Sequence, residues 1–252
     1  MKYNWDWSIY TQTAADGSGT WLHYLLAGLV WSIATALCAW VIALTVGSIV
    51  GTLRTTPYRW VVRLGNAYVE LFRNIPLIVQ MFLWFFVLPE LVPKVLGDAI
   101  KQTPPPWGSY IPAVLCLGIY TSVRVAEQVR AGIQSLPRGQ LMAGTALGLS
   151  LPQTYRHVLL PMAFRIVMPP LTSEFLNIIK NSSVALTIGL LELTGRARAM
   201  QEFTFKVFEA FSAATVIYLL TNLVIVLLMR ELEKKVRVPG FIGSATQVTA
   251  GH

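Results

Sequence analysis

The stretch from Ser135 to Pro161, SLPRGQLMAGTALGLSLPQTYRHVLLP, decides how the rest of the chain is arranged. It is too polar to lie in lipid, and Ser-Leu-Pro occurs twice in it, at 135–137 and 150–152. Serine caps free N–H groups at a helix start and proline is tolerated in the first turn, while Ser-x-x-Gln in the second copy forms a capping box. Gly148 is suited to close the first helix, because glycine adopts the left-handed conformation without steric cost. We expect two short helices, the second ending at Pro161.

The composition is that of a membrane protein. Hydrophobic residues make up 54% of the 252 residues and charged residues 13%, unlike an average soluble domain. The net charge of +8 would suggest a nucleic-acid partner in a soluble protein. Here we attribute it to the Lys and Arg that hold cytoplasmic loops inside, and expect no nucleic acid. Cys38 and Cys116 both lie in apolar segments, so neither a disulfide framework nor a metal site is expected.

Hydropathy and charge predict an all-α, polytopic transmembrane bundle of about five spans, with the amino terminus outside and the carboxyl terminus inside. The expected spans are residues 21–53, 65–92, 110–133, 162–191 and 211–229. The first connection and the tail are basic, whereas 90–109 and 193–210 have balanced charge and are expected to be outside connections. Residues 1–20 should then form a periplasmic segment, 21–240 the transmembrane domain and 241–252 a cytoplasmic tail.

Two details of the spans leave alternatives open. Gly47 and Gly51 form a GxxxG pattern, which permits close packing either within the chain or against a second subunit. Residues 65–92 are expected to form one long helix that carries Glu70 and Arg73 near its start. These two charges lie three residues apart, so they either pair with each other or face protein rather than lipid.

The segment from 135 to 161 resembles the cytoplasmic coupling loop of ABC importer permeases, whose pattern is Glu-Ala-Ala, three residues, Gly, nine residues and Ile-x-Leu-Pro. The corresponding residues are 142–144, Gly148 and 158–161, at the same spacing. Met142 stands where the family usually has Glu, and Gly144 where it usually has Ala. The alternative is an ordinary amphipathic hairpin at the membrane surface. The resemblance implies contact with an ATPase through Gln140, Met142, Ala143, Gly144, Gly148, Leu160 and Pro161.

Three further phrases resemble the polar amino acid branch of these importers, and the glutamate/aspartate permeases within it. They are YVELFR at 68–73, AEQVRAGIQS at 126–135 and NIIKNSS at 177–183. The resemblance implies a multi-pass permease in the bacterial inner membrane, working with a second permease subunit, either a paralogue or an identical copy. It also implies two ATPase subunits and a periplasmic solute-binding protein. ATP and Mg²⁺ would bind to the ATPase, and this chain would need no cofactor.

Polar groups inside the expected spans are the candidates for the substrate pathway. They are Arg124, Glu127, Glu174, Asn177 and Lys180. Charges are costly in lipid, and a span interrupted by Pro169-Pro170 and polar groups is tolerated where protein or a watery cavity surrounds it. Arg124 stands where the family commonly has Tyr, and a guanidinium there could hold a carboxylate through two hydrogen bonds. Alternatively, Arg124 pairs with Glu127 or Glu174 and only packs the bundle.

No GxxxxGK[ST] loop, HExxH motif or plausible Ser-His-Asp set occurs in the sequence. We therefore expect a transport subunit that is not an enzyme, with ATP hydrolysis in a separate ATPase. The favoured function is import of glutamate and aspartate by alternating access. One alternative is the same importer class acting on glutamine, arginine or histidine. Another is a secondary transporter, although such proteins usually show internal repeats, which we do not find here.

Overall fold

The computed structural model describes residues 3–236, which form helices joined by short connections, with one isolated antiparallel bridge between Thr13 and Thr20. The all-α class is therefore confirmed for this part of the chain, whereas the expected tail at 241–252 lies outside it. The elements are η1 (Trp7–Thr11), α1 (Trp21–Leu53), α2 (Arg59–Arg73), α3 (Leu77–Phe82), η2 (Leu83–Val87), α4 (Leu88–Leu91), α5 (Lys94–Lys101), α6 (Trp107–Gln134), α7 (Arg138–Ala146), α8 (Leu151–Thr154), η3 (Tyr155–Leu159), α9 (Leu160–Asn181), η4 (Ser182–Ile188), α10 (Leu193–Thr204) and α11 (Val207–Val236). Two of the short elements, η2 and η3, are π-helical.

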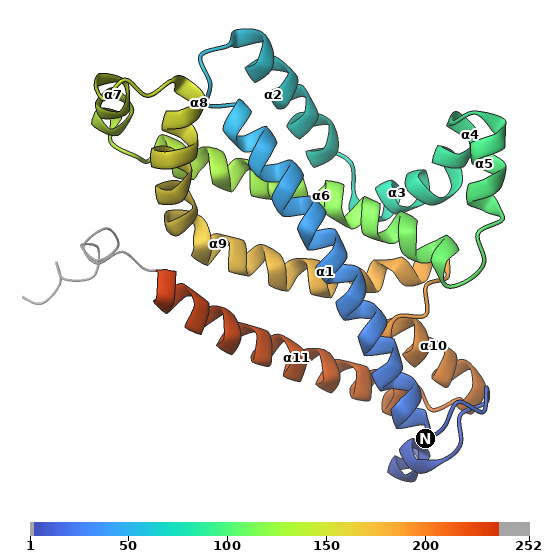
Figure 1. The fold of residues 1–252 in the computed structure, drawn as a ribbon. Coiled ribbons are helices and arrows are strands. Elements are labelled where there is room, and N and C mark those ends of the chain that lie inside the picture. Colours follow the sequence, from blue (N-terminus) through green and yellow to red (C-terminus); the bar gives the residue numbers. More distant parts are fainter. Residues whose placement is uncertain (1–2, 237–252) are drawn as a thin grey trace, which may run out of the picture.

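The long helices build the body of the molecule. α6, α9 and α11 lie side by side, and α1 crosses them (Figure 1). The crossing of α1 and α6 is close because glycines lie in it. A Cβ on Gly47 would be 2.6 Å from the carbonyl oxygen of Ser122, and one on Gly51 would be 2.6 Å from that of Ala126. Of the two alternatives for the GxxxG pattern, the structure shows close packing within the chain.

The expected long helix over 65–92 is broken, and this prediction was wrong. α2 and the segment Leu77–Leu91 meet at an angle of 98°. Pro76 has no N–H to continue the helical ladder and disfavours helix in the residue before it. Gln80, which is 1% exposed, stabilises the break. Its side-chain Nε2 donates to the carbonyl oxygens of Phe72 at 2.8 Å and Ile75 at 3.0 Å, which would otherwise be left without partners.

The two connections expected on the outer side of the membrane also contain helices. α5 follows Pro93 within 90–109, and α10 occupies most of 193–210. α10 forms because the side chain of Glu192 accepts hydrogen bonds from the backbone N–H groups of Thr194 and Gly195, as an N-cap does. In addition, α9 runs through Pro169-Pro170 without a break and gives way to η4 only at Ser182.

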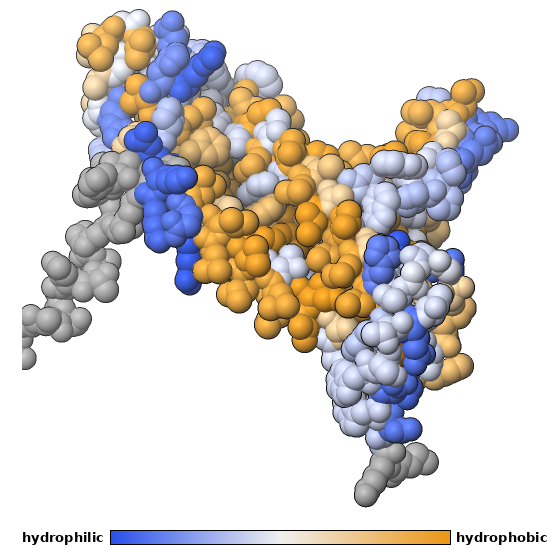
Figure 2. All heavy atoms as spheres, turned by 60° about the horizontal axis from the view of Figure 1, so that its bottom comes forward, coloured by the Kyte–Doolittle hydropathy of each residue, from blue (hydrophilic) through white to orange (hydrophobic). Residues whose placement is uncertain are grey.

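Three helices, α1, α6 and α11, are long and apolar enough to cross a membrane, and the bent pair of Arg59–Arg73 and Leu77–Leu91 gives up to four such spans. Five spans and their orientation therefore stay a prediction. Figure 2 shows hydrophobic residues gathered in a broad band across the middle of the face formed by α1 and α11, with hydrophilic residues toward the ends. On α11 this band includes Leu219, Leu220, Leu223, Val224, Leu227 and Leu228, all exposed. A band of this kind is suited to contact lipid.

Candidate functional site: a charged pocket and a polar hairpin

Helices α2, α6 and α9 line an open charged pocket of about 680 Å³. The charged pocket is lined by Phe72 and Arg73 at the end of α2, by Tyr120, Val123, Arg124, Glu127 and Gln128 of α6, and by Glu174 of α9. The bend after α2 turns the chain away just beyond Arg73, which leaves this space open beside α6. Three of the five expected pathway residues, Arg124, Glu127 and Glu174, thus line one cavity, while their role in transport stays a prediction.

Arg124 makes a long ion pair at this pocket and stays accessible. Its Nη1 lies 3.5 Å from Glu174 Oε2, and its Nη2 donates to Tyr120 Oη at 3.1 Å. The guanidinium carbon also lies 5.3 Å from the centre of the Tyr120 ring, within cation–π range. The side chain of Arg124 is nevertheless 46% exposed. The sequence left Glu127 and Glu174 as possible partners, and the structure gives Glu174.

Glu127 belongs to a cluster that ties three helices together. Its Oε1 accepts from Arg54 Nη2 at 2.9 Å, and Arg130 Nη1 lies 3.6 Å from its Oε2. Arg54 is buried and also donates through Nε to Asn66 Oδ1 at 2.8 Å. The cluster links the end of α1 to α2 and α6. The sequence suggested only that Arg54 belongs to a basic connection, whereas in the structure it joins three helices. The Glu127 carboxylate is paired with two arginines, Arg54 and Arg130.

Asn177 and Lys180 lie further along α9 and do not line the charged pocket. Asn177 is half-buried and Lys180 is exposed. No ion pair joins Glu70 to Arg73 within residues 3–236, so that suggested pairing is not formed. Arg73 faces the charged pocket instead.

Sequence reasoning missed Arg73 and Gln128 as pocket residues. Gln128 donates through Nε2 to Glu174 Oε1 at 3.3 Å. A signal for it existed, because Gln128 follows Arg124 by four residues and so lies on the same face of the helix. Arg73 had no such local signal, because only the packing of α2 beside α6 brings it to the charged pocket.

The polar hairpin (residues 135–161) forms much as its sequence predicts. α7 ends next to Gly148, whose φ of 79° is left-handed. Ser150 and Gln153 form the expected capping box at the start of α8. Gly144 is buried against α8, since a Cβ there would lie 2.6 Å from Thr154 Cγ2. Met142 and Leu147 are 67% and 81% exposed. This is an apolar surface that a partner could cover.

Two expectations about the ends of the polar hairpin were wrong. Ser135 does not cap α7; it ends α6, and its hydroxyl donates to the Gly132 carbonyl oxygen at 2.8 Å. Pro161 does not stop the second helix, because α8, η3 and α9 are continuous. In the π-helical turn the N–H of Leu160 bonds to the Tyr155 carbonyl oxygen, and this wider turn accommodates the proline that follows. Leu160 and Pro161 thus belong to the base of α9.

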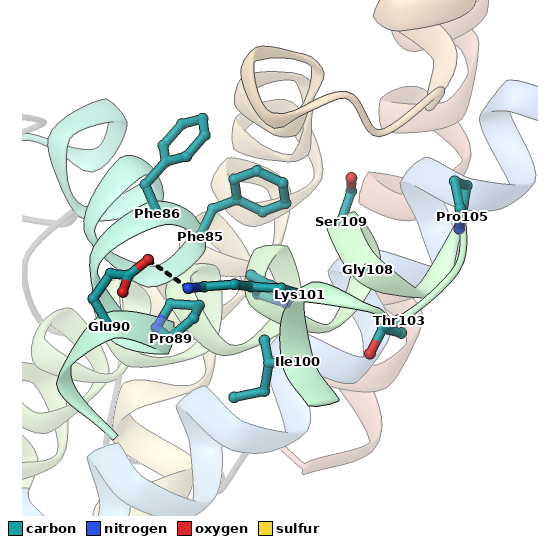
Figure 3. Close-up of a pocket in the computed structure, with 11 residues that line it drawn as sticks. Phe85, Phe86, Pro89, Glu90, Ile100, Lys101, Thr103, Pro105, Gly108 and Ser109 are labelled. Atoms are coloured by element: carbon teal, nitrogen blue, oxygen red, sulfur yellow. Dashed lines mark ion pairs between the residues drawn. The ribbon is translucent and has the colours of Figure 1, made fainter. Parts of the chain in front are cut away.

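A second cavity of about 490 Å³ lies beside the helical pair α4 and α5. Figure 3 shows Phe85, Phe86, Pro89 and Ile100 around it, together with the ion pair between Glu90 and Lys101. The Lys101 Nζ to Glu90 Oε1 distance is 2.5 Å, and this contact raises the pKa of Lys101 above its usual value. With both charged groups satisfied by each other, this cavity offers a ligand mainly apolar walls and a few hydroxyl and backbone groups.

A lipid-facing bundle, a charged cavity between its helices and a polar hairpin with exposed apolar side chains define a class, that of helical membrane transport subunits. The chain belongs to the binding-protein-dependent transport system inner membrane component family, whose model matches residues 43–238. Membership and the apolar helices together indicate a multi-pass inner-membrane protein.

Proteins of known identity agree with this membership. The glutamate/aspartate import permease protein GltJ of Escherichia coli (strain K12) is 48% identical over 244 residues, covering 96% of this chain and 99% of that protein. The probable glutamine ABC transporter permease protein GlnM of Bacillus subtilis (strain 168) is 35% identical, covering 79% and 88%. A crystal structure of an amino acid ABC transporter with histidines has a TM-score of 0.72 at 26% identity, covering 85% of this chain and 95% of that chain.

Proposed function

We propose that this chain is a permease subunit of an ATP-driven importer that carries glutamate and aspartate across the bacterial inner membrane. The observation that carries the substrate assignment is Arg124, an accessible guanidinium in a cavity between membrane helices. A guanidinium there binds a carboxylate through charge-assisted hydrogen bonds, which are stronger where little water competes. The extensive similarity to GltJ points to the same substrates.

The importer would contain partners that this chain does not supply. A second permease subunit, a paralogue or an identical copy, would complete the pathway, and a periplasmic binding protein would deliver the amino acid. Two ATPase subunits would bind ATP and Mg²⁺ and receive the polar hairpin. The exposed Met142 and Leu147 support such a contact, because unpaired apolar side chains on a polar hairpin gain from being covered.

The hairpin would transmit force because it is continuous with a pathway helix. Closure of the ATPase pair would move the polar hairpin, and the unbroken run from α8 through η3 to α9 would carry that motion to Glu174 in the charged pocket. This is a rigid-body alternation between outward and inward access. Within the hairpin, Met142 and Ala143 would make the partner contact, while Gly144 and Gly148 would maintain the shape of the turn.

A second candidate is the same class of importer for another polar amino acid. GlnM, a probable glutamine permease, is a relative, and Glu127 and Glu174 add negative charge to the pocket lining that would suit a cationic substrate. Glu127 is already engaged by Arg54 and Arg130, however, which favours the acidic assignment.

The test is uptake of labelled glutamate into proteoliposomes that contain the whole importer, with the binding protein added outside and ATP inside. We expect uptake that requires both additions and is blocked best by unlabelled aspartate and glutamate. Stronger competition by glutamine, arginine or histidine would contradict the substrate assignment but keep the importer. Uptake that persists without ATP would contradict the importer and favour a secondary transporter.

A further inference from the structure

We propose that the charged pocket recognises all three charges of an acidic amino acid, with Glu174 and Gln128 receiving its ammonium group and Arg124 and Arg73 its two carboxylates. This inference rests on the proposed function and goes further, because it assigns a separate part of the pocket to each substrate group. The ammonium site in particular involves residues that a preference for carboxylates alone would not require.

The charge of the pocket supports this division. The lining contains two guanidinium groups, on Arg73 and Arg124, and two carboxylates, on Glu127 and Glu174. Glu127 is already engaged by Arg54 at 2.9 Å and Arg130 at 3.6 Å. Two guanidinium groups and the carboxylate of Glu174 then remain for a ligand, with Arg124 and Glu174 joined to each other only at 3.5 Å. Glutamate and aspartate carry the complementary set, two carboxylates and one ammonium group.

Two buried acceptors that lack a hydrogen bond mark the proposed place of the ammonium group. Gln128 Oε1 and Glu174 Oε2 accept no hydrogen bond from the part of the chain that the structure describes, although Glu174 Oε2 lies 3.5 Å from Arg124 Nη1. The two side chains are already joined through their other ends, by the 3.3 Å bond from Gln128 Nε2 to Glu174 Oε1. Buried acceptors without donors are costly, and an ammonium group with three N–H donors would satisfy both.

The contact between Arg124 and Glu174 is suited to exchange. Its 3.5 Å separation is longer than the roughly 2.7–2.9 Å of a charge-assisted hydrogen bond. Glu174 thus occupies, at this longer distance, the position beside Arg124 that a substrate carboxylate would take. When the substrate binds, Arg124 would transfer to the substrate carboxylate while Glu174 Oε2 would accept the ammonium group. Arg73, with no ion-pair partner within residues 3–236, would hold the second carboxylate.

Equilibrium binding to the purified permease–ATPase complex tests this without interference from the binding protein, which selects substrates by itself. Labelled L-glutamate is displaced by unlabelled L-glutamate, by glutarate, which lacks the ammonium group, or by L-glutamine, which lacks the second carboxylate. We expect the wild-type complex to prefer glutamate over both. In Glu174→Gln the preference for glutamate over glutarate should fall about tenfold or more, as expected for loss of a hydrogen bond between charged groups.

The remaining variants separate the two halves of the pocket. Gln128→Met should also reduce the preference for glutamate over glutarate. If Glu174→Gln does not assemble, this variant alone tests the ammonium site. Arg124→Gln should instead reduce the preference for glutamate over glutamine. Glu202→Gln, which neutralises an exposed carboxylate paired with Arg198, should change neither preference.

Two failures can be told apart. If the wild-type complex binds glutamine or histidine more tightly than glutamate, the proposed substrate is wrong. If it prefers glutamate and aspartate, but assembled Glu174→Gln and Gln128→Met complexes keep the full preference over glutarate, the ammonium site is wrong and the proposed function stands.

Discussion

Gly47 shows how a single residue determines the fit between two helices. A Cβ at this position would lie 2.6 Å from both the Ser122 carbonyl oxygen and Val125 Cβ, so the helices would have to separate. We predict that Gly47→Val lowers the stability of the purified complex by about 1–3 kcal/mol, as overpacking does. Thermal unfolding in detergent would measure this change.

Gly139 in α7 supplies the matched control for that measurement. It is exposed, and nothing lies within 4 Å of a Cβ built there. Gly139→Ala should be neutral or should stabilise by about 0.5–1 kcal/mol, because alanine favours helix. Equal losses in the two variants would contradict the account of the α1–α6 crossing.

Arg54 and Glu127 make a second prediction at this scale. Arg54 is 7% exposed, so removing its partner would leave a guanidinium buried without a counter-charge. We expect Glu127→Gln to lower the free energy of unfolding by about 1.5–3 kcal/mol. Glu202→Gln, which breaks the exposed pair with Arg198, should cost less than about 1 kcal/mol. The same unfolding measurement compares them, and equal losses would argue against the buried cluster.

The sequence led to some pocket residues and not to others. Arg124 and Glu174 stood out because charges within apolar segments are costly and need a reason. Glu192 directly precedes the expected outside connection at 193–210 and was counted with its charges, yet it is fully buried and accepts hydrogen bonds from Ser32 Oγ and Tyr218 Oη on two other helices. Its contacts arise from three segments far apart in the chain, and local pattern cannot reveal such a meeting.

The turn between the two hairpin helices was predicted well from Gly148 and the Ser150 cap, whereas the cap expected at Ser135 and the effects of two prolines were predicted wrongly. Ser150 and Gly148 worked as expected because their effect is local. Pro76 was passed over as a break and Pro161 was taken for one. Whether each proline breaks its helix depends on how the neighbouring residues satisfy the backbone groups around it. Gln80 satisfies the carbonyls at the first site, and a π-helical turn accommodates the ring at the second.

The polar hairpin supports a prediction at the scale of elements. Ala143 is exposed, so Ala143→Trp should leave thermal stability unchanged while it blocks contact with an ATPase. We expect glutamate uptake to fall steeply in proteoliposomes, with ATP hydrolysis no longer stimulated by the loaded binding protein. Unimpaired uptake would rule out Ala143 as a partner contact.

Gly144 and Gly148 should behave differently from Ala143. Gly144→Val would clash with Thr154 and should lower the unfolding temperature. Gly148→Ala meets no neighbour within 4 Å but holds a left-handed φ of 79°, which costs a non-glycine residue about 1–2 kcal/mol. Losses of uptake in these two variants should therefore accompany losses of stability.

For the whole molecule, the expected orientation is open to a direct test. In a chain whose free cysteines Cys38 and Cys116 are replaced by serine, Ala15→Cys should react with a membrane-impermeant maleimide in intact spheroplasts. Arg156→Cys, which lies in the polar hairpin, should react only after the membrane is opened. The reverse pattern would invert the topology, and labelling of both sites from outside would contradict the three spans expected between residues 15 and 156.

The most direct test of the central claim is the choice between glutamate and glutamine made by the reconstituted importer, with and without the Arg124 guanidinium. Arg124→Tyr introduces the aromatic residue that the family resemblance suggests for this position and removes one of the two positive charges from the pocket lining. We predict that the variant assembles normally, that glutamate uptake falls at least about tenfold, and that glutamate loses its advantage over glutamine. An assembled variant that transports glutamate at the wild-type rate would show that Arg124 only packs the bundle.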